Sequence, residues 1–218
     1  MVTVANRLAV SWIRQMRCIN SVALACLLIL MLPFAGEAWP AGLELDEYLQ
    51  RAAAAKTRGD WESVASQVAQ AINHPDLPKA GAIRSDVHLE YGRAMGVLCQ
   101  YDEAEKYLLL ARDIAAKAGL STFPALVELG ASSTVQKKFA AAVGYFSQLP
   151  AMIERESRIR TAPLLVADAY EKFANALVAT GKPDEAELPR REAGKIREAG
   201  VKATPGLITP YGAMCPKS

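Results

Sequence analysis

Histidine and cysteine, which build many metal and catalytic sites, are scarce in this chain. There are two histidines, His74 and His88, and four cysteines in 218 residues, and none has the spacing of zinc ligands. The sequence also lacks a phosphate-binding Gly-Lys loop, a nucleophile elbow and a His-Glu helix motif. Adjacent acids such as Asp102 and Glu103 begin an expected helix, where they offset the helix dipole. We therefore expect no catalytic residue, no metal site, no cofactor and no enzymatic activity.

Aromatic residues and net charge are scarce too. Phe, Trp and Tyr make up 7% of the chain, and the formal net charge is only +2. That excess comes from the first 38 residues, because basic and acidic residues balance after them. A neutral body gives no electrostatic sign of nucleic acid as a partner. The shortage of aromatics, together with abundant alanine, favours helices over a β-sandwich.

The N-terminal segment has the order of a secretory signal peptide. Arginines without any acid precede an apolar run over 22–34, and small residues follow up to Ala38. The run is shorter than the ~20 apolar residues that span a bilayer. We therefore predict a signal peptide over 1–38, cleaved after Ala38, and a periplasmic or secreted protein.

Two other interpretations of this segment stay open. It could remain uncleaved as a short anchor, the one case in which we expect contact with a membrane. It could also be a lipoprotein signal, although Cys26 lies inside the apolar run rather than at its end. The start residue is open as well, because a start at Met16 instead of Met1 would give a charged region of more ordinary length.

Four stretches of the remaining sequence are alike. Each has a turn, then an acidic or small first helical turn, then a small residue, with apolar residues at three- and four-residue spacing. Another helical pattern precedes each stretch. Aligning them on Val64, Ala104, Ala142 and Ala186 gives spacings of 40, 38 and 44 residues. The pattern predicts a chain of helix-turn-helix units between residues 39 and 200.

These units resemble the tetratricopeptide repeat (TPR) family, whose period is ~34 residues. The resemblance rests on Tyr91-Gly92 with Ala104 and Ala111, on Leu129-Gly130 with Ala142 and Phe146, and on Phe173-Ala174 with Ala186 and Ala193. It implies an all-α, right-handed solenoid of about four helix-turn-helix repeats over 39–200. Because the spacing is longer than in the family, we expect extended loops or helices.

Prolines and the tail add three expectations. Pro150 is expected to interrupt the second helix of the third unit, and Pro189 to make the last helix begin late, bend or serve as an irregular end cap. Residues 201–218 read as an extended tail, apolar enough to pack back on the last helices. An exported chain meets oxidising conditions, so Cys99 and Cys215 could pair, although two free thiols remain the alternative.

In the TPR family the first helices of the repeats line a concave groove that holds the partner. On this resemblance, the candidate partner-binding residues are Leu49, Lys56, Leu89, Arg93, Val127, Glu171 and Asn175. Only Arg93 and Asn175 resemble the family's clamp for a terminal carboxylate, so we do not expect capture of a C-terminus. Apolar groove positions suit an amphipathic helix or an extended peptide better. Ordinary protein surface is the alternative for all of these positions.

The sequence thus favours an exported, non-enzymatic adaptor or scaffold that binds a protein or peptide. The alternative is a periplasmic protein that binds a small molecule or a cell-wall fragment. A closed pocket with convergent polar groups would favour that alternative. The identity of the partner, the pathway and the oligomeric state stay open at this point.

Overall fold

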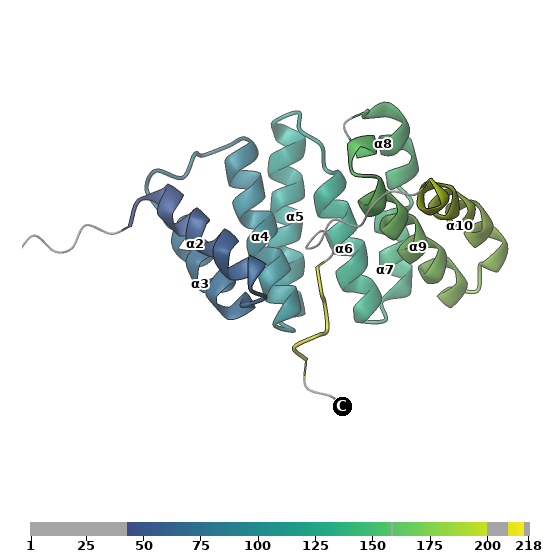
Figure 1. Ribbon diagram of the computed structural model, residues 1–218, viewed down its shortest axis with the longest axis horizontal. Helices are drawn as coiled ribbons and strands as arrows, with labels where there is room; N and C mark the ends of the chain where they lie inside the picture. The colour runs from purple at the N-terminus through teal and green to yellow at the C-terminus, as the bar shows by residue number, and fades with distance from the viewer. Residues whose placement is uncertain (1–42, 158, 200–208, 216–218) are drawn as a thin grey trace, which may run out of the picture. The chain divides into compact units, whose positions relative to one another are not determined.

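The computed structural model describes residues 43–157, 159–199 and 209–215. All regular elements in these ranges are helical, so the all-α prediction is confirmed (Figure 1). The predicted signal peptide, its cleavage after Ala38 and both candidate start residues lie outside the described residues. Within the described ranges, no helix is long and apolar enough to cross a membrane.

The helices form pairs that follow one another along the chain. Their order is α2 (Leu45–Thr57), α3 (Trp61–Ile72), α4 (Ala82–Val97), α5 (Tyr101–Lys117), α6 (Phe123–Val135), α7 (Phe139–Phe146), α8 (Leu149–Arg155), a short 3-10 turn η1 (Ile159–Thr161), α9 (Pro163–Ala179) and α10 (Pro183–Glu198). Both helices of a pair pack against each other: α2 with α3, α4 with α5, α6 with α7, and α9 with α10. Each pair also packs against the next, and the first helices α4, α6 and α9 contact one another in succession.

The turn inside each pair is built in the same way. One residue with positive φ lies five positions before the aligned small residue of the second helix: Gly59, Cys99, Lys137 and Gly181, with φ between 60° and 76°. Glycine adopts this conformation without strain, but Cys99 and Lys137 carry a side chain there. The same left-handed backbone conformation therefore recurs in all four turns, even where the residue type does not favour it.

Small residues let the two helices of a pair approach closely. Ala104, Ala142 and Ala186 are fully buried. A side-chain carbon on Gly130 would overlap the ring of Phe146, itself fully buried on α7. These are positions on which the family resemblance rested, and in the structure they lie where helices touch.

Pro150 and Pro189 affect their helices differently. The second helix of the third pair is split into α7 and α8 as predicted, with Pro150 in the first turn of α8. Of the three alternatives for the last helix, the late start is wrong, because α10 begins at Pro183 and continues through Pro189 to Glu198. Pro183 fits the first helical turn, where a backbone N–H would have no intrahelical partner.

We had expected the tail to pack on the last helices, but its described part, residues 209–215, packs elsewhere. Tyr211 lies against Gly96 of α4, and Gly212 lies beside Val135 at the end of α6. It is the yellow segment of Figure 1, which ends near the mark for the C-terminus. The tail therefore returns to the second and third helix pairs.

Candidate binding face

A chain of polar contacts runs across α2, α4, α6 and the tail. Lys56 Nζ lies 2.7 Å from Glu90 Oε2, Glu90 also pairs with Arg93, and Arg93 Nε donates to Glu128 Oε1 over 2.8 Å. The hydroxyl of Tyr211 donates to the other oxygen, Glu128 Oε2, over 2.8 Å. The Lys56–Glu90 contact joins α2 to α4, and the Arg93–Glu128 contact joins α4 to α6. We call the side of the molecule on which these four residues lie the first-helix face.

The centre of the polar chain is buried. The side chains of Arg93 and Glu128 are 15% and 4% exposed. Burial alone would lower the pKa of Arg93, but the carboxylates of Glu128 and Glu90 raise it above its usual value. Burial would likewise raise the pKa of Glu90, yet Arg93 and Lys56 lower it. With the tail in place these charges and hydrogen bonds satisfy one another, so the polar chain stabilises the packing of α2, α4, α6 and the tail.

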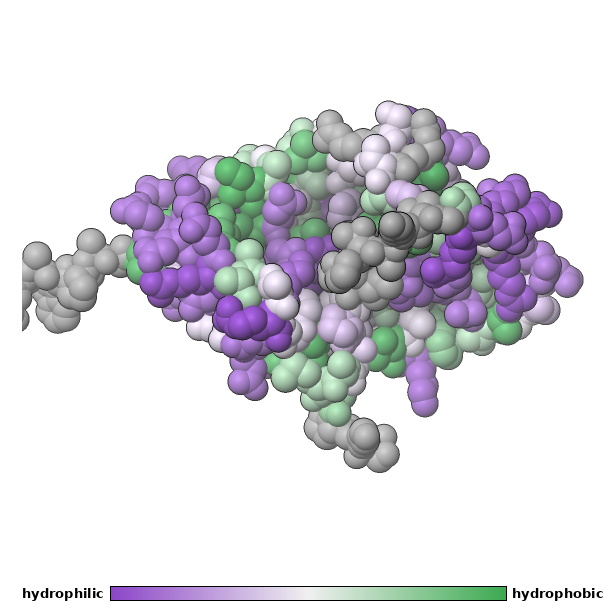
Figure 2. Space-filling model, viewed as in Figure 1, coloured by the Kyte–Doolittle hydropathy of each residue, from purple (hydrophilic) through white to green (hydrophobic). Residues whose placement is uncertain are grey.

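An apolar cavity of about 340 Å³ opens beside the Lys56–Glu90 pair, between α2, α3 and α4. Its lining comprises Leu49, Ala52, Ala53, Lys56, Val64, Val68, Ile83, Asp86, Val87 and Glu90. Ile83 remains 50% exposed at its edge. In Figure 2, hydrophobic surface gathers over the upper part of α4 and borders hydrophilic surface over α2. The cavity thus offers an accessible apolar wall with charge on one side.

Asp86 is the acid of the cavity whose charge is not neutralised. Glu90 has Lys56 and Arg93 as partners, whereas Asp86 has no ion pair in the part of the chain that the structure describes. Partial burial raises the pKa of Asp86 and the neighbouring charge of Glu90 raises it further, whereas the charge of Arg93 lowers it. A cation bound here would relieve both effects. The cavity can therefore accept an apolar group that carries a positive charge.

The structure brings three of the predicted groove residues together. Leu49 and Lys56 line the cavity, and Arg93 lies in the polar chain next to it. The other two that we had expected as apolar groove surface are buried: Leu89 is 7% and Val127 is 4% exposed. That expectation is wrong for both, because Leu89 belongs to an apolar cluster with residues of α5 and α6, and Val127 to one with residues of α7, α8 and α9.

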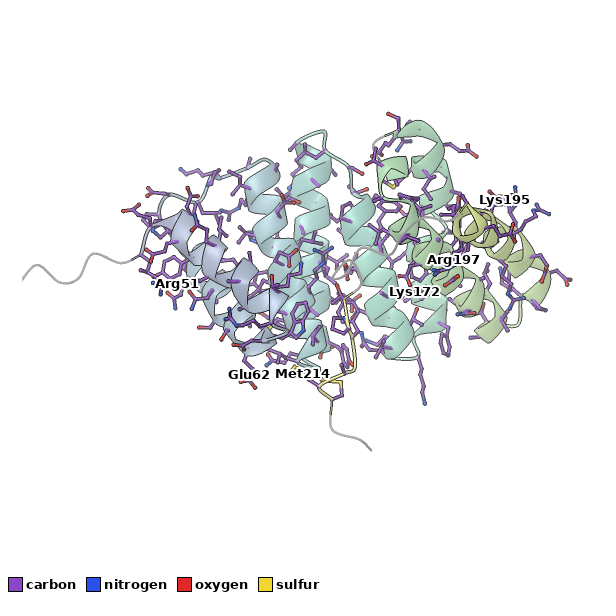
Figure 3. All side chains as sticks on the ribbon, in the orientation of Figure 1. Arg51, Glu62, Lys172, Lys195, Arg197 and Met214 are labelled. Carbon is purple, nitrogen blue, oxygen red and sulfur yellow. A yellow bond between two sulfur atoms is a disulfide. The ribbon has the colours of Figure 1, made fainter. Side chains whose placement is uncertain are left out.

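Glu171 and Asn175, on α9, do not join the cavity. Glu171 Oε2 accepts from Arg197 of α10 over 2.7 Å, and Asn175 is exposed. Lys172, labelled with Arg197 in Figure 3, pairs with Asp168 on the same helix. The α9–α10 end of the chain thus presents ion pairs rather than an apolar site.

Several residues of the face were missed by sequence reasoning. Asp86 and Ile83 belong to the first turns of α4 and gave no signal there. Glu128 did give one, since it is the only charged residue between Phe123 and Val135. An acid inside such an apolar helix needs a partner, and Arg93 and Tyr211 supply it.

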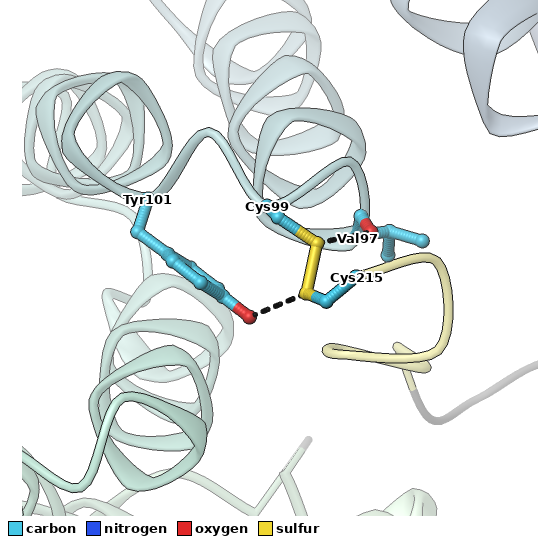
Figure 4. The surroundings of a disulfide bond; sticks show 4 residues. All are labelled: Val97, Cys99, Tyr101 and Cys215. Atoms are coloured by element: carbon cyan, nitrogen blue, oxygen red, sulfur yellow. Dashed lines mark hydrogen bonds between the residues drawn. A yellow bond between two sulfur atoms is a disulfide. The ribbon is translucent and has the colours of Figure 1, made fainter. Parts of the chain in front are cut away.

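A disulfide between Cys99 and Cys215 fastens the tail to the end of α4 (Figure 4). The two Cα atoms are 5.6 Å apart. The hydroxyl of Tyr101, the first residue of α5, lies 3.1 Å from the Cys215 sulfur. The pair that the sequence had left open is thus joined, and it holds the tail beside the first-helix face.

The described residues hold no cluster of histidine, cysteine or acidic side chains that could bind a metal ion. His88 is buried within α4, where its Nδ1 lies 2.6 Å from the carbonyl oxygen of Arg84. Its ring lies near that of Tyr107, with centroids 5.8 Å apart. This histidine is therefore part of the packing between α4 and α5.

No protein-family model matches the chain, and no curated protein is similar enough to count as a match.

Proposed function

We propose that the protein is an exported, TPR-like adaptor that binds a segment of another protein at the cavity between α2, α3 and α4. The observation that carries the proposal is an open apolar cavity lined in part by the carboxylate of Asp86, which has no ion pair among the residues that the structure describes. A large apolar side chain next to a lysine or arginine matches this site. Such anchors in a pocket supply much of the affinity of protein interfaces.

Recurring features of the chain support a TPR-like, right-handed solenoid. The positive-φ residue recurs at the equivalent position of every paired turn, from Gly59 to Gly181. Successive first helices contact one another, as stacked repeats require. In such a stack the first helices form the concave side, so the cavity would open on the surface where partners bind.

Two independent features support export. The N-terminal sequence has basic, apolar and small-residue regions in the order of a signal peptide. A disulfide between Cys99 and Cys215 also suits an oxidising compartment. Expression of the full chain in a bacterial host and mass spectrometry of the exported protein would test this. We expect an N-terminus at Trp39, and recovery of the uncleaved chain in the membrane fraction would contradict it.

Photo-cross-linking tests the binding site directly. A photoreactive amino acid at Ile83, on the cavity edge, should give a discrete protein adduct in cells that produce the full chain. The matched control is the same amino acid at Leu188, which is 57% exposed on α10. The Ile83 adduct should disappear with Ala53→Trp, which fills the cavity from an exposed helix position. Equal adducts at both sites, or an Ile83 adduct that survives Ala53→Trp, would overturn the proposal.

Small-molecule binding is the second candidate, favoured by the cavity volume. About 340 Å³ is at the low end of the range for such sites, about 300–1,000 Å³. A cell-wall fragment fits poorly, because sugars need many hydrogen bonds and only Lys56, Asp86 and Glu90 bring charged groups. An apolar amine that raises the melting temperature of the wild-type chain, but not that of Asp86→Asn, would favour this candidate.

A further inference from the structure

We propose that residues 209–215 are a built-in occupant of the first-helix face, and that the Cys99–Cys215 disulfide controls access to the site beneath them. When the disulfide is reduced, the tail can be displaced by an extended peptide segment that presents a tyrosine. The inference takes from the proposed function only that this face binds peptide segments. It concerns a seat between α4 and α6, separate from the cavity between α2, α3 and α4.

The seat of Tyr211 is shaped for an aromatic ring. Gly96 of α4 lies directly under the ring, and any side-chain carbon at that position would overlap it. The ring therefore occupies space that exists only because residue 96 is glycine. The next residue of the tail, Gly212, lies close to Val135, so the segment is seated on α4 and α6 together.

The seat also selects the hydroxyl group. Glu128 is buried, and its two oxygens have different partners: Oε1 accepts from Arg93 and Oε2 accepts from Tyr211. If a ring without a hydroxyl took the place of Tyr211, it would exclude water and leave Oε2 a buried acceptor without a donor. A buried carboxylate oxygen strongly favours a ligand that restores the hydrogen bond. The seat thus prefers tyrosine to phenylalanine.

The tail has two anchors, and they are close together. Besides Tyr211, the main attachment is Cys215, four positions further along the chain. Between them, Ala213 and Met214 are exposed, with Met214 47% exposed (Figure 3). Loss of the disulfide would leave the Tyr211 seat as the principal attachment of this segment, and a competing tyrosine could then replace it.

The opening step is thiol–disulfide exchange with a dithiol reductant. A thiolate of the reductant attacks one sulfur of the Cys99–Cys215 bond and forms a mixed disulfide, releasing the other cysteine as a thiolate. The second thiol of the reductant then displaces the remaining cysteine. Two electrons and two protons pass to the protein, which ends with two thiols while the reductant ends as its own disulfide. Both cysteines are partly exposed.

A labelled copy of the tail tests the proposal by fluorescence anisotropy. The probe is a fluorescein-labelled peptide of residues 207–218 with Cys215→Ser, added to the full chain. We expect no measurable binding to the oxidised wild type. The variant Cys99→Ser/Tyr211→Ala removes both anchors of the tail but keeps the seat. It should bind the peptide at least tenfold more tightly than the oxidised wild type does. The wild type in dithiothreitol should lie between them, because its own Tyr211 still competes.

Two controls identify the seat. A peptide with Tyr211→Phe should bind at least tenfold more weakly, and since only the peptide changes, protein folding cannot explain the loss. Adding Gly96→Ala to the two-residue variant should abolish binding, with circular dichroism to verify that the helices persist. Equal binding to oxidised and reduced wild type, or equal binding of the tyrosine and phenylalanine peptides, would overturn the proposal.

The cavity proposal is judged separately. If the peptide binds the seat but Ile83 gives no specific cross-link, the proposal for the tail stands and the proposed binding site in the cavity is rejected. An Ile83 adduct together with no peptide binding to a folded Cys99→Ser/Tyr211→Ala variant would do the opposite.

Discussion

The hydroxyl of Tyr211 donates a hydrogen bond to Glu128 over 2.8 Å, although the two residues are 83 positions apart in the chain. Tyr211→Phe removes this bond and leaves a buried carboxylate oxygen without its donor. Hydrogen bonds to charged groups are worth about 1.5–3 kcal/mol, and we expect a loss of that size in the free energy of unfolding. Urea denaturation of the oxidised chain measures it.

Tyr145→Phe is the matched control for this prediction. It removes a longer hydrogen bond, 3.2 Å, from Tyr145 to Glu105, and neither of these residues is buried. We expect a loss below about 1 kcal/mol there, because water can replace the bond. Equal losses for the two tyrosines would show that the Tyr211 contact is not specially important.

Arg93 is the buried charge on which the polar chain depends. Arg93→Met leaves the carboxylates of Glu128 and Glu90 without their shared cation, and breaking a buried pair in this way costs about 3–5 kcal/mol. The control is Arg197→Met, whose pair with Glu171 is nearly half exposed and should contribute about 1 kcal/mol or less. Chemical denaturation of both variants provides the comparison, and a loss for Arg93→Met no larger than the control would contradict it.

The helices and their turns could be read from the sequence because they depend on local spacing. Ala104 and Ala142 were identified as small positions of helix pairs, and both are fully buried. Three- and four-residue periodicity reports which side of a helix is apolar. It does not report which flank a neighbouring helix covers, and so Leu89 and Val127 were expected on the surface although they are buried.

Local patterns left the location of the tail open, with a Cys99–Cys215 pair as one possibility. Cys99 and Cys215 are 116 positions apart, and their pairing depends on how α4 and the tail come together in space. Glu128 was a local signal that something polar had to approach α6, but nothing in its neighbourhood named Tyr211 as that partner. Sites that join distant segments need the folded chain to define them.

Gly130 and Gly144 allow a direct test of close helix packing. Gly130→Ala would place a methyl group against the buried ring of Phe146, and we expect a loss of about 1–3 kcal/mol in unfolding free energy. Gly144→Ala adds the same methyl group on α7, where nothing lies nearby, and should stabilise the chain by about 0.5–1 kcal/mol. Thermal unfolding of the two variants measures both changes in stability. A Gly130→Ala variant more stable than the wild type would refute the close contact.

His88 should make the stability of the chain depend on pH near neutrality. Burial lowers the pKa of its imidazole in the folded chain, whereas the unfolded value is about 6.5. As the pH falls below about 6.5, the unfolded chain binds a proton that the folded chain resists, so stability must fall with it. The contribution of Glu90, whose pKa is lowered from 4.5, is lost only at more acidic pH. The interval between pH 7.5 and 5.5 therefore reports on histidine.

His88→Asn isolates this effect, because an amide can keep the hydrogen bond to the carbonyl of Arg84 but does not titrate. We expect urea midpoints of the wild type to fall between pH 7.5 and 5.5, and those of His88→Asn to change much less. His74→Gln is the control. Its urea midpoint should depend on pH as that of the wild type does, because His88 is still present. A His88→Asn variant with the slope of the wild type would show that the proton is taken up elsewhere, and that His88 can be charged inside the fold.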